Sequence, residues 1–366
     1  MSKLLKTTPL KDGFYMPGEF EPHVGCWMVF PERLDTWRAK AGPAQATFAQ
    51  VANAISQFEP VTMVVSKATE KAARAILNSK VRILVYPSDD SWMRDIGPTF
   101  VRNKAGDVRG VDWIFNAWGG QAYESWDQDD LMAKNVLDYL KIDRYRAPLI
   151  LEGGSIHSDG EGTIYTTEEC LLNPNRNPNL TKQQIENYLK EYLGAEKVIW
   201  IPYGVFKDET SGHVDNICCV IKPGRVFLGW SDNPDDPQYE RSQKDYEYLS
   251  KMTDARGRKI EVVKMPMPTK PLYRSKEQAL EIETQLAKAR PVGERLAASY
   301  VNFYIANGGI VMPTFGLPSD HAAIELIKRE FPDRKVVPIP SIEVLLGGGN
   351  FHCITQQEIK TPRHKS

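Results

Sequence analysis

The residues best suited to chemistry are one cysteine, one histidine and several carboxylates at separate points of the chain. Cys353 follows three glycines and an asparagine, a turn whose backbone can adopt conformations closed to other residues and approach another group closely. His213 and Asp215 lie two residues apart, so at the start of a strand their side chains would face the same side. Asp95 and Glu152 supply further carboxylates in polar or glycine-containing segments.

Together these groups suit a reaction at the carbon of a guanidinium ion. Two carboxylates that flank a slot match the planar guanidinium fork, and a cysteine thiolate above its centre can attack the carbon. A histidine can then protonate the departing nitrogen and later activate water. A thiol peptidase also uses cysteine and histidine, but it needs one orienting polar group rather than a cage of acids. Each residue alone also fits an ordinary structural role, so the hypothesis depends on a fold that brings them together.

The segments between these residues repeat one pattern of a hairpin, a helix and a strand. The predicted hairpins cover residues 99–114, 155–165, 217–229 and 301–312, and the predicted helices cover residues 129–140, 182–193, 239–252 and 321–331. From Asp95 to Glu152 to His213 the spacing is 57 and then 61 residues, within the range of repeat architectures. A polar or glycine-rich corner ends each copy, so a closed ring would bring the candidate residues to one axis.

The two ends of the chain complete the pattern. The strand Val24–Phe30 is expected to pair with a final strand at Phe351–Thr355, which closes the ring and removes a free edge. We therefore predict one α/β domain over residues 1–366, a five-bladed α/β propeller of ββαβ repeats closed by the N-terminal strand. The hairpin before each helix disfavours a doubly wound parallel sheet. An insertion at residues 268–299, rich in charged residues and glutamine and expected to be partly helical, has no role that the sequence reveals.

Composition narrows the class of protein. The 46 Lys and Arg residues nearly balance the 47 Asp and Glu residues, without a basic stripe, so nucleic acid and membrane are poor candidates as partners. The five cysteines have no framework spacing, and no clustered metal-ligand spacing is present. The first residues lack the apolar core of a signal peptide. We expect a cytoplasmic protein with reduced thiols and neither metal nor cofactor.

Five motifs make the chain resemble the agmatine deiminases of the guanidine-modifying enzyme superfamily from end to end. They are residues 89–98 (DDSWMRDIGP), 116–120 (NAWGG), 151–157 (LEGGSIH), 212–216 (GHVDN) and 347–357 (GGGNFHCITQQ). These motifs are long and specific. The resemblance implies a five-bladed α/β propeller, and a hydrolase that converts agmatine into N-carbamoylputrescine and ammonia for putrescine and polyamine biosynthesis.

The resemblance also implies a role for each candidate residue. Cys353 is the nucleophile that forms a covalent amidino intermediate. His213 is the general acid and then the general base, and Glu152 orients it. Asp95 and Asp215 hold the guanidinium ion from either side. No cofactor is implied, the partner is a small guanidine substrate, and a homodimer is allowed.

The far end of the substrate and the exact substrate stay open. Glu209 and Trp92 are the candidates for binding an alkylammonium group, because a carboxylate and an aromatic face both suit a cation. A deiminase acting on peptidyl or free arginine would instead need donors for a carboxylate or amide, for which Lys207 and Arg94 are candidates. Two further alternatives are a catalytically inactive propeller that serves as a binding scaffold, and a Cys/His/Asp amide hydrolase.

Overall fold

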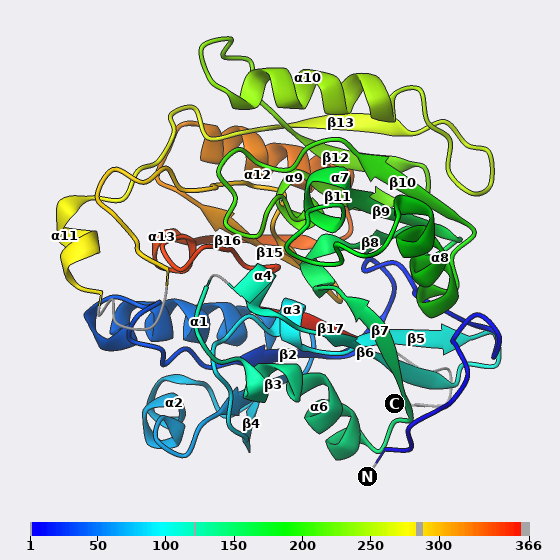
Figure 1. The fold of residues 1–366 in the computed structure, drawn as a ribbon. Helices are drawn as coiled ribbons and strands as arrows, with labels where there is room; N and C mark the ends of the chain where they lie inside the picture. Colours follow the sequence, from blue (N-terminus) through cyan, green and yellow to red (C-terminus); the bar gives the residue numbers. More distant parts are fainter. Residues whose placement is uncertain (1, 121, 283–287, 360–366) are drawn as a thin grey trace.

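The computed structural model describes residues 2–120, 122–282 and 288–359, and within these it is a mixed α/β structure (Figure 1). The described strands form five separate sheets of three or four strands each. Residues 1, 121 and 360–366 of the predicted domain, and residues 283–287 of the insertion, lie outside the described part. Three sheets come from continuous segments, a fourth adds β1 (Phe14–Tyr15) antiparallel to β5 (Thr99–Asn103), and the fifth joins the two ends of the chain.

One local order of elements supplies three strands to each of the first four sheets. A hairpin supplies two antiparallel strands, and a helix then carries the chain to a third strand that pairs in parallel, because parallel strands need a crossover connection. The four units are β5 (Thr99–Asn103), β6 (Val108–Ile114), α6 (Met132–Leu140) and β7 (Arg144–Ile150); β8 (His157–Ser158), β9 (Thr163–Thr167), α8 (Lys182–Leu193) and β10 (Lys197–Ile201); β11 (Cys218–Lys222), β12 (Arg225–Trp230), α10 (Gln238–Leu249) and β13 (Glu261–Pro266); and β14 (Tyr304–Ala306), β15 (Gly309–Thr314), α12 (Ser319–Glu330) and β16 (Lys335–Pro340).

The fifth sheet joins the two ends of the chain. β17 (Gln356–Ile359) pairs antiparallel with β2 (His23–Val29), which continues in parallel to β3 (Val61–Val65) and β4 (Val81–Val85) through α1 (Gly42–Ile55) and α2 (Glu70–Ile76). The predicted pairing of the two ends is thus present. The predicted strand at residues 351–355 is wrong, because Phe351 to Ile354 form turns and the strand begins at Gln356. The Thr355 hydroxyl donates to the carbonyl oxygens of Phe351 and His352, which holds this segment in a turn.

Short helical turns stand where the candidate residues were expected on strands or loops. α3 (Met93–Ile96) precedes β5, the 3-10 turn η2 (Gly153–Ser155) precedes β8, and α9 (Val214–Ile217) precedes β11. The expectation that His213 and Asp215 start a strand is therefore wrong, since the strand begins at Cys218. The remaining short elements are β1 (Phe14–Tyr15), η1 (Ala39–Ala41), α4 (Ala117–Gly120), α5 (Asp127–Asp130), α7 (Glu168–Leu171), α11 (Lys276–Leu280) and α13 (Ile342–Leu345).

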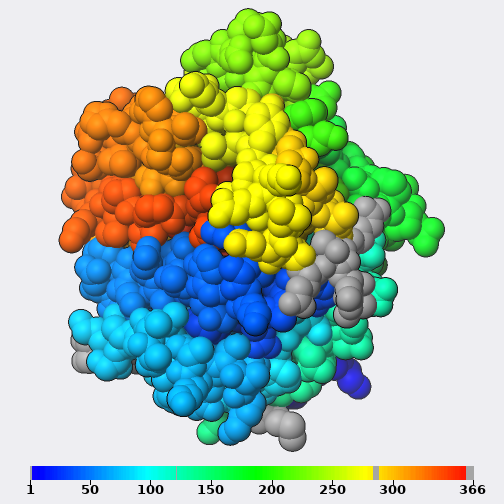
Figure 2. All heavy atoms as spheres, turned by 90° about the vertical axis from the view of Figure 1, so that its left-hand side faces the viewer, coloured from blue at the N-terminus to red at the C-terminus, as the bar shows by residue number. Residues whose placement is uncertain are grey.

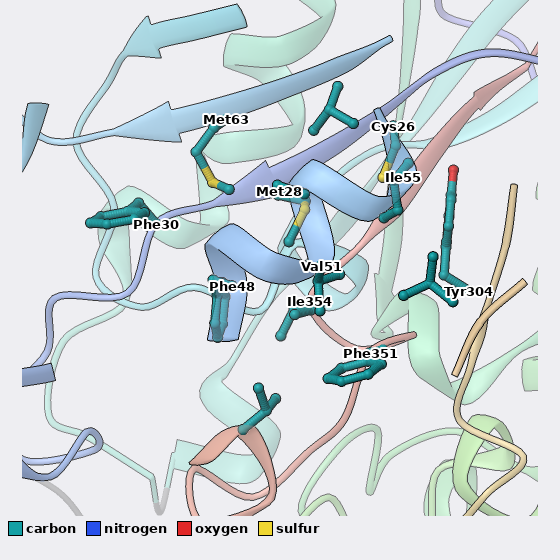
Figure 3. Close-up of a cluster of buried hydrophobic side chains, with 14 of the residues drawn as sticks. Cys26, Met28, Phe30, Phe48, Val51, Ile55, Met63, Tyr304, Phe351 and Ile354 are labelled. Atoms are coloured by element: carbon teal, nitrogen blue, oxygen red, sulfur yellow. The ribbon is translucent and has the colours of Figure 1, made fainter. Parts of the chain in front are cut away.

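The hydrophobic core reaches the segment that carries Cys353. Phe48 and Val51 of α1 belong to a buried cluster that also contains Met63 of β3. Phe351 and Ile354, on either side of the cysteine in sequence, belong to the same cluster (Figure 3). Packing against the fifth sheet and its helix therefore fixes the backbone around Cys353.

The insertion lies on the surface rather than inside a sheet. Its described part contains α11, and the yellow segment in Figure 2 lies on one face beside the blue N-terminal and the orange and red C-terminal parts of the chain. In the described part of the chain no helix has the length and apolar character needed to span a bilayer.

Phe48→Ala tests the packing of α1. Phe48 is completely buried, and removing a buried aromatic ring leaves a cavity, so we expect the free energy of unfolding to fall by about 3–5 kcal/mol. Urea denaturation followed by circular dichroism measures this. Gln50→Ala, an exposed change on the same helix, should alter it by less than about 0.5 kcal/mol. Equal stability of the two variants would contradict the packing described here.

Candidate active site

The five predicted catalytic side chains lie together, and all are buried. The Cys353 sulfur lies 3.5 Å from Oδ2 of Asp215. His213 lies between two acids, with Nδ1 3.8 Å from Oδ1 of Asp95 and Nε2 3.5 Å from Oε2 of Glu152. The helical turns before β5, β8 and β11 and the turn before β17 present these groups to one another. Residues that are far apart in sequence thus form one cluster.

Gly154 leaves a slot at the centre of this cluster. A Cβ atom added there would lie 2.6 Å from Nδ1 of His213, 2.8 Å from Oδ1 of Asp95 and 2.9 Å from Oδ2 of Asp215. Any side chain would therefore collide with the polar atoms. The Gly154 amide also donates to Oδ1 of Asp95 at 3.0 Å. The glycine keeps the space between the two aspartates open and aims one of them.

The two aspartates have opposite electrostatic environments. Burial raises the pKa of Asp95 to about 6; His213 opposes this shift, and the charges of Asp215 and Glu152 add to it. Its Oδ2 accepts a hydrogen bond from Nε1 of Trp118 at 2.9 Å. Burial also acts to raise the pKa of Asp215, but the hydrogen bond and charge of His352 outweigh it and lower that pKa.

His213 is held as a cation by its surroundings. Burial acts to lower the pKa of the ring, but the Asp95 carboxylate, together with Cys170 and Glu152, outweighs burial and raises it well above its ordinary value. Glu152 is in turn fixed by Arg176, whose Nε donates to Oε1 at 2.7 Å. Burial acts to raise the pKa of Glu152, and the Arg176 guanidinium outweighs that effect and lowers it. Sequence reasoning missed Arg176, which lies outside the motif of its partner.

The Cys353 thiol is neutral at rest. Burial, followed by the charges of Asp215 and Asp95, raises its pKa well above the usual value. Asn302 orients the group, because its Nδ2 donates to the sulfur at 3.2 Å and its Oδ1 accepts from the His352 amide at 2.9 Å. Sequence reasoning also missed Asn302. It stands just before the first strand of the fourth unit, as the other site residues stand before theirs, and that position was the available signal.

A cavity open to solvent, with about 660 Å³ of empty space including its solvent-filled mouth, leads to the cluster. Trp92 and Glu209, the two candidates for the far end of a substrate, line it together with Cys353 and Asp95. Lys207 and Arg94, the donors suggested for a carboxylate, do not line it. Lys207 is exposed, and Arg94 is buried with Nη1 bonded to Glu19 at 3.1 Å and to Gln357 at 2.7 Å.

The insertion supplies the cations that do line the cavity, Lys288 and Arg290. Arg290 Nη1 donates to Oε1 of Glu209 at 2.8 Å and to the carbonyl oxygen of Leu346 at 3.0 Å, and Nη2 donates to that of Gly347 at 2.8 Å. Arg274 adds a bond to the Leu346 oxygen at 3.1 Å. Two arginines of the insertion therefore hold the glycine turn that precedes Cys353.

Two buried groups have donor atoms close enough to hold a metal ion. They are Glu152, Cys170 and His213, and Glu19, His157 and His352, with ligand atoms within 4.8 Å of one another in each group. In each group an arginine already bonds to the carboxylate, Arg176 to Glu152 and Arg94 to Glu19. A metal ion would therefore face a guanidinium charge at short range.

Comparison with known proteins gives the family of this chain. The model of the Porphyromonas-type peptidyl-arginine deiminase family matches residues 15–358. The chain belongs to this family. It is 51% identical over 360 residues to the agmatine deiminase of Ectopseudomonas mendocina, covering 97% of this chain and 98% of that protein.

Solved structures agree with this assignment. The agmatine deiminase of Enterococcus faecalis, described as catalysing its reaction, superposes with a TM-score of 0.96 and 44% identity, over 98% of this chain and 100% of that chain. A cysteine-to-serine variant of the agmatine deiminase of C. jejuni with substrate bound superposes with a TM-score of 0.84 and 25% identity, over 96% and 97% of the two chains.

Arg290→Met tests whether the insertion positions the glycine turn. The methionine keeps the apolar stem but loses every bond to Glu209 and to the two carbonyl oxygens, so we expect a roughly ten- to hundredfold loss of kcat/KM from misplacement of Cys353. Steady-state ammonia release measures it. Lys288→Met is the matched control, because the Lys288 Nζ lies 3.8 Å from Glu209 and that side chain is 41% exposed. A loss below about threefold in both variants would contradict this role.

Proposed function

We propose that this protein is an agmatine deiminase that hydrolyses agmatine to N-carbamoylputrescine and ammonia through a covalent amidino-cysteine intermediate. The observation that carries the proposal is the slot above Gly154, bounded by Asp95, Asp215 and His213 and adjoined by the Cys353 sulfur. The two aspartates on either side suit the planar fork of a guanidinium ion. Relatives named agmatine deiminases support the choice of substrate.

Substrate binding is the step that activates the nucleophile. The two aspartates each bond to one side of the guanidinium, and Oδ1 of Asp215, which has no hydrogen-bond partner among the described residues, is available for this. The bound cation offsets the negative charges that raise the pKa of the Cys353 thiol. It therefore favours transfer of the thiol proton to solvent in the cavity that Cys353 lines, which leaves the thiolate.

The chemistry then proceeds in two halves. The thiolate forms a C–S bond to the guanidinium carbon, and His213, already protonated, gives a proton to the leaving nitrogen as its C–N bond breaks and ammonia departs. The neutral His213 takes a proton from water, which attacks the same carbon. Collapse of the adduct breaks the C–S bond, the hydroxyl proton passes to the departing sulfur, and the ureido product leaves with the thiol and the protonated His213 restored. Glu152, fixed by Arg176, orients the ring through both halves.

The far end of the cavity sets the choice of substrate. Trp92 and Glu209 offer an aromatic face and a carboxylate to an alkylammonium group. Glu209 already bonds to Arg290, so it keeps its orientation before substrate arrives. The cations at this end of the cavity favour a second candidate function, a deiminase of free or peptidyl arginine. Lys288 and Arg290 line the cavity, and such side chains can bind a carboxylate.

The proposed architecture follows from the five sheets. We propose that residues 1–366 form one domain in which the sheets close as a five-bladed α/β propeller of ββαβ repeats. The pairing of β17 with β2 supports this, because it joins the first and last parts of the chain in one blade. Three further points stay predictions from the resemblance: that the protein forms a homodimer, that it is cytoplasmic, and that it takes part in putrescine biosynthesis.

Ammonia release from agmatine, free arginine and a C-terminal arginine peptide tests the substrate. We expect release from agmatine, with a transient mass increase that maps to Cys353. Cys353→Ala should abolish both, while Cys218→Ala, a buried cysteine on strand β11, should retain turnover. A large preference for free arginine or for the arginine peptide would show that agmatine is not the substrate, while the proposed mechanism would still hold. Turnover by Cys353→Ala would overturn the mechanism, and no reaction with any guanidine would leave a binding scaffold.

The pH dependence of kcat/KM tests the role of Asp95. Its pKa of about 6 means that it is ionised above that pH and gains a proton as the pH falls through it. We therefore expect kcat/KM for agmatine to decrease by about tenfold per pH unit below this value, since a neutral acid loses its attraction for the guanidinium. Asp95→Asn should remove this acid limb and lower kcat/KM by at least about a hundredfold. An unchanged acid limb in that variant would contradict the assignment.

A further inference from the structure

His352, next to the nucleophile in sequence, bridges two buried carboxylates. Its Nδ1 lies 2.8 Å from Oδ2 of Asp215, and its Nε2 lies 2.9 Å from both oxygens of Glu19. All three residues are buried. Glu19 belongs to the segment before β2 and takes no part in the chemistry proposed above. The ring thus connects one wall of the guanidinium slot to an acid behind it.

The contacts define the charge of this ring. An ionised carboxylate only accepts hydrogen bonds, so a ring with a carboxylate at each nitrogen must carry a proton on both. The groups that face it are Asp215 from α9, Glu19, Arg94 from α3, and His157 from β8. Burial and Arg94 act to lower the pKa of His352, but Glu19 and Asp215 outweigh them and raise it.

The neighbours complete a balanced set of charges. Arg94 bonds to Glu19 at 3.1 Å. Although burial acts to raise the pKa of Glu19, Arg94 and the histidines hold it well below the usual value. His157 stacks on His352 with ring centroids 5.0 Å apart, but burial lowers its pKa to about 4, so it is neutral. Two carboxylates are therefore matched by one imidazolium and one guanidinium.

The ring is not needed to hold the loop that carries the nucleophile. The backbone amides of His352 and Cys353 both donate to Oδ1 of Asn302, at 2.9 and 3.4 Å. The carbonyl oxygen of Cys353 accepts from the Arg94 amide at 3.0 Å. Since backbone contacts already fix the turn, the side chain of His352 has a separate task.

We propose that His352 is a positioning residue: as an imidazolium anchored by Glu19, it keeps Asp215 ionised and turned so that Oδ1 faces the guanidinium of the substrate. This inference rests on the proposed function, because it assigns a partner to one of the two carboxylates of the substrate slot. The Oδ2 atom of Asp215 is occupied by the ring, so the other oxygen is directed to the ligand. The same charge compensates Asp215 while the site is empty.

His352→Gln tests the proposal through the pH profile of agmatine deimination. Glutamine keeps a hydrogen-bond donor but carries no charge, so Asp215 should bind a proton at a higher pH. In the wild type Asp95 sets the acid limb of kcat/KM. In His352→Gln we expect Asp215 to gain its proton at a pH above the pKa of Asp95, so the limb should steepen and move up by at least about one pH unit, with a rise in KM as the main component and recovery of most activity at alkaline pH. A purely structural histidine would lower kcat at every pH and leave the limb in place, and that result would overturn the proposal.

His157→Gln is the matched control. It makes the same change in a buried histidine that stacks on His352 but makes no hydrogen bond to Asp215, so the acid limb should stay at its wild-type position. An equal shift in both variants would assign the effect to general repacking and overturn the specific role of His352. Thermal denaturation of both variants, followed by circular dichroism, identifies any loss of fold.

A measurement on the wild-type protein needs no substitution. Ring-nitrogen NMR, with the His352 ring assigned through its own backbone amide, should show both nitrogens protonated at mildly alkaline pH. A ring with a single proton would overturn the proposal. This result is independent of turnover, so the wild-type protein could fail to deiminate agmatine and the charge state would still be decided. Conversely, normal deimination with an unshifted limb in His352→Gln would reject this inference alone.

Discussion

Charge balance among buried side chains is the constraint on which the rest of the structure depends. Asp95, Glu152 and Asp215 are all buried, and an ionised carboxylate removed from water is costly unless it is paired and hydrogen-bonded. Glu152 has Arg176, and Asp215 has His352. Asp95 has neutral donors in Gly154 and Trp118, with His213 near it. Under the proposed function, a guanidinium ion bound between Asp95 and Asp215 adds a positive charge to this cluster, so substrate binding also favours the thiolate.

The fold satisfies this constraint by placing short turns, rather than long elements, around the site. Three helical turns precede β5, β8 and β11, and a further turn precedes β17. A turn aims successive side chains in different directions, so Arg94 can point away to Glu19 while its neighbour Asp95 points into the slot. Hydrophobic clusters pack against these turns and fix them, which keeps the charged groups close together at little cost in reorganisation.

The insertion shows how a surface segment contributes to a buried site. Arg274 and Arg290 reach inward to carbonyl oxygens at the end of α13. The glycines there have few side-chain contacts with which to fix their own conformation, so the arginines supply the restraint from outside. Arg290 also holds Glu209, which couples the shape of the turn before Cys353 to the far end of the cavity.

The sequence by itself determined the repeating order of elements, the pairing of the two ends, and the group of Cys353, His213, Glu152, Asp95 and Asp215. Hydrophobic periodicity and glycine turns are local properties, and the motifs carry the chemistry directly. The sequence did not predict the turns at Phe351–Ile354 and Val214–Ile217, where strands were expected. Short apolar stretches can form either a turn or a strand, and tertiary contacts determine which one forms.

Only the tertiary structure showed that Asn302, Arg176 and His352 contact the catalytic candidates, and that Arg94 points away from the cavity. The position of Asn302 in the repeat was a signal, but partners of a buried charge are chosen by distance in space, so Arg176 and His352 carry no local sign of the charge that each faces.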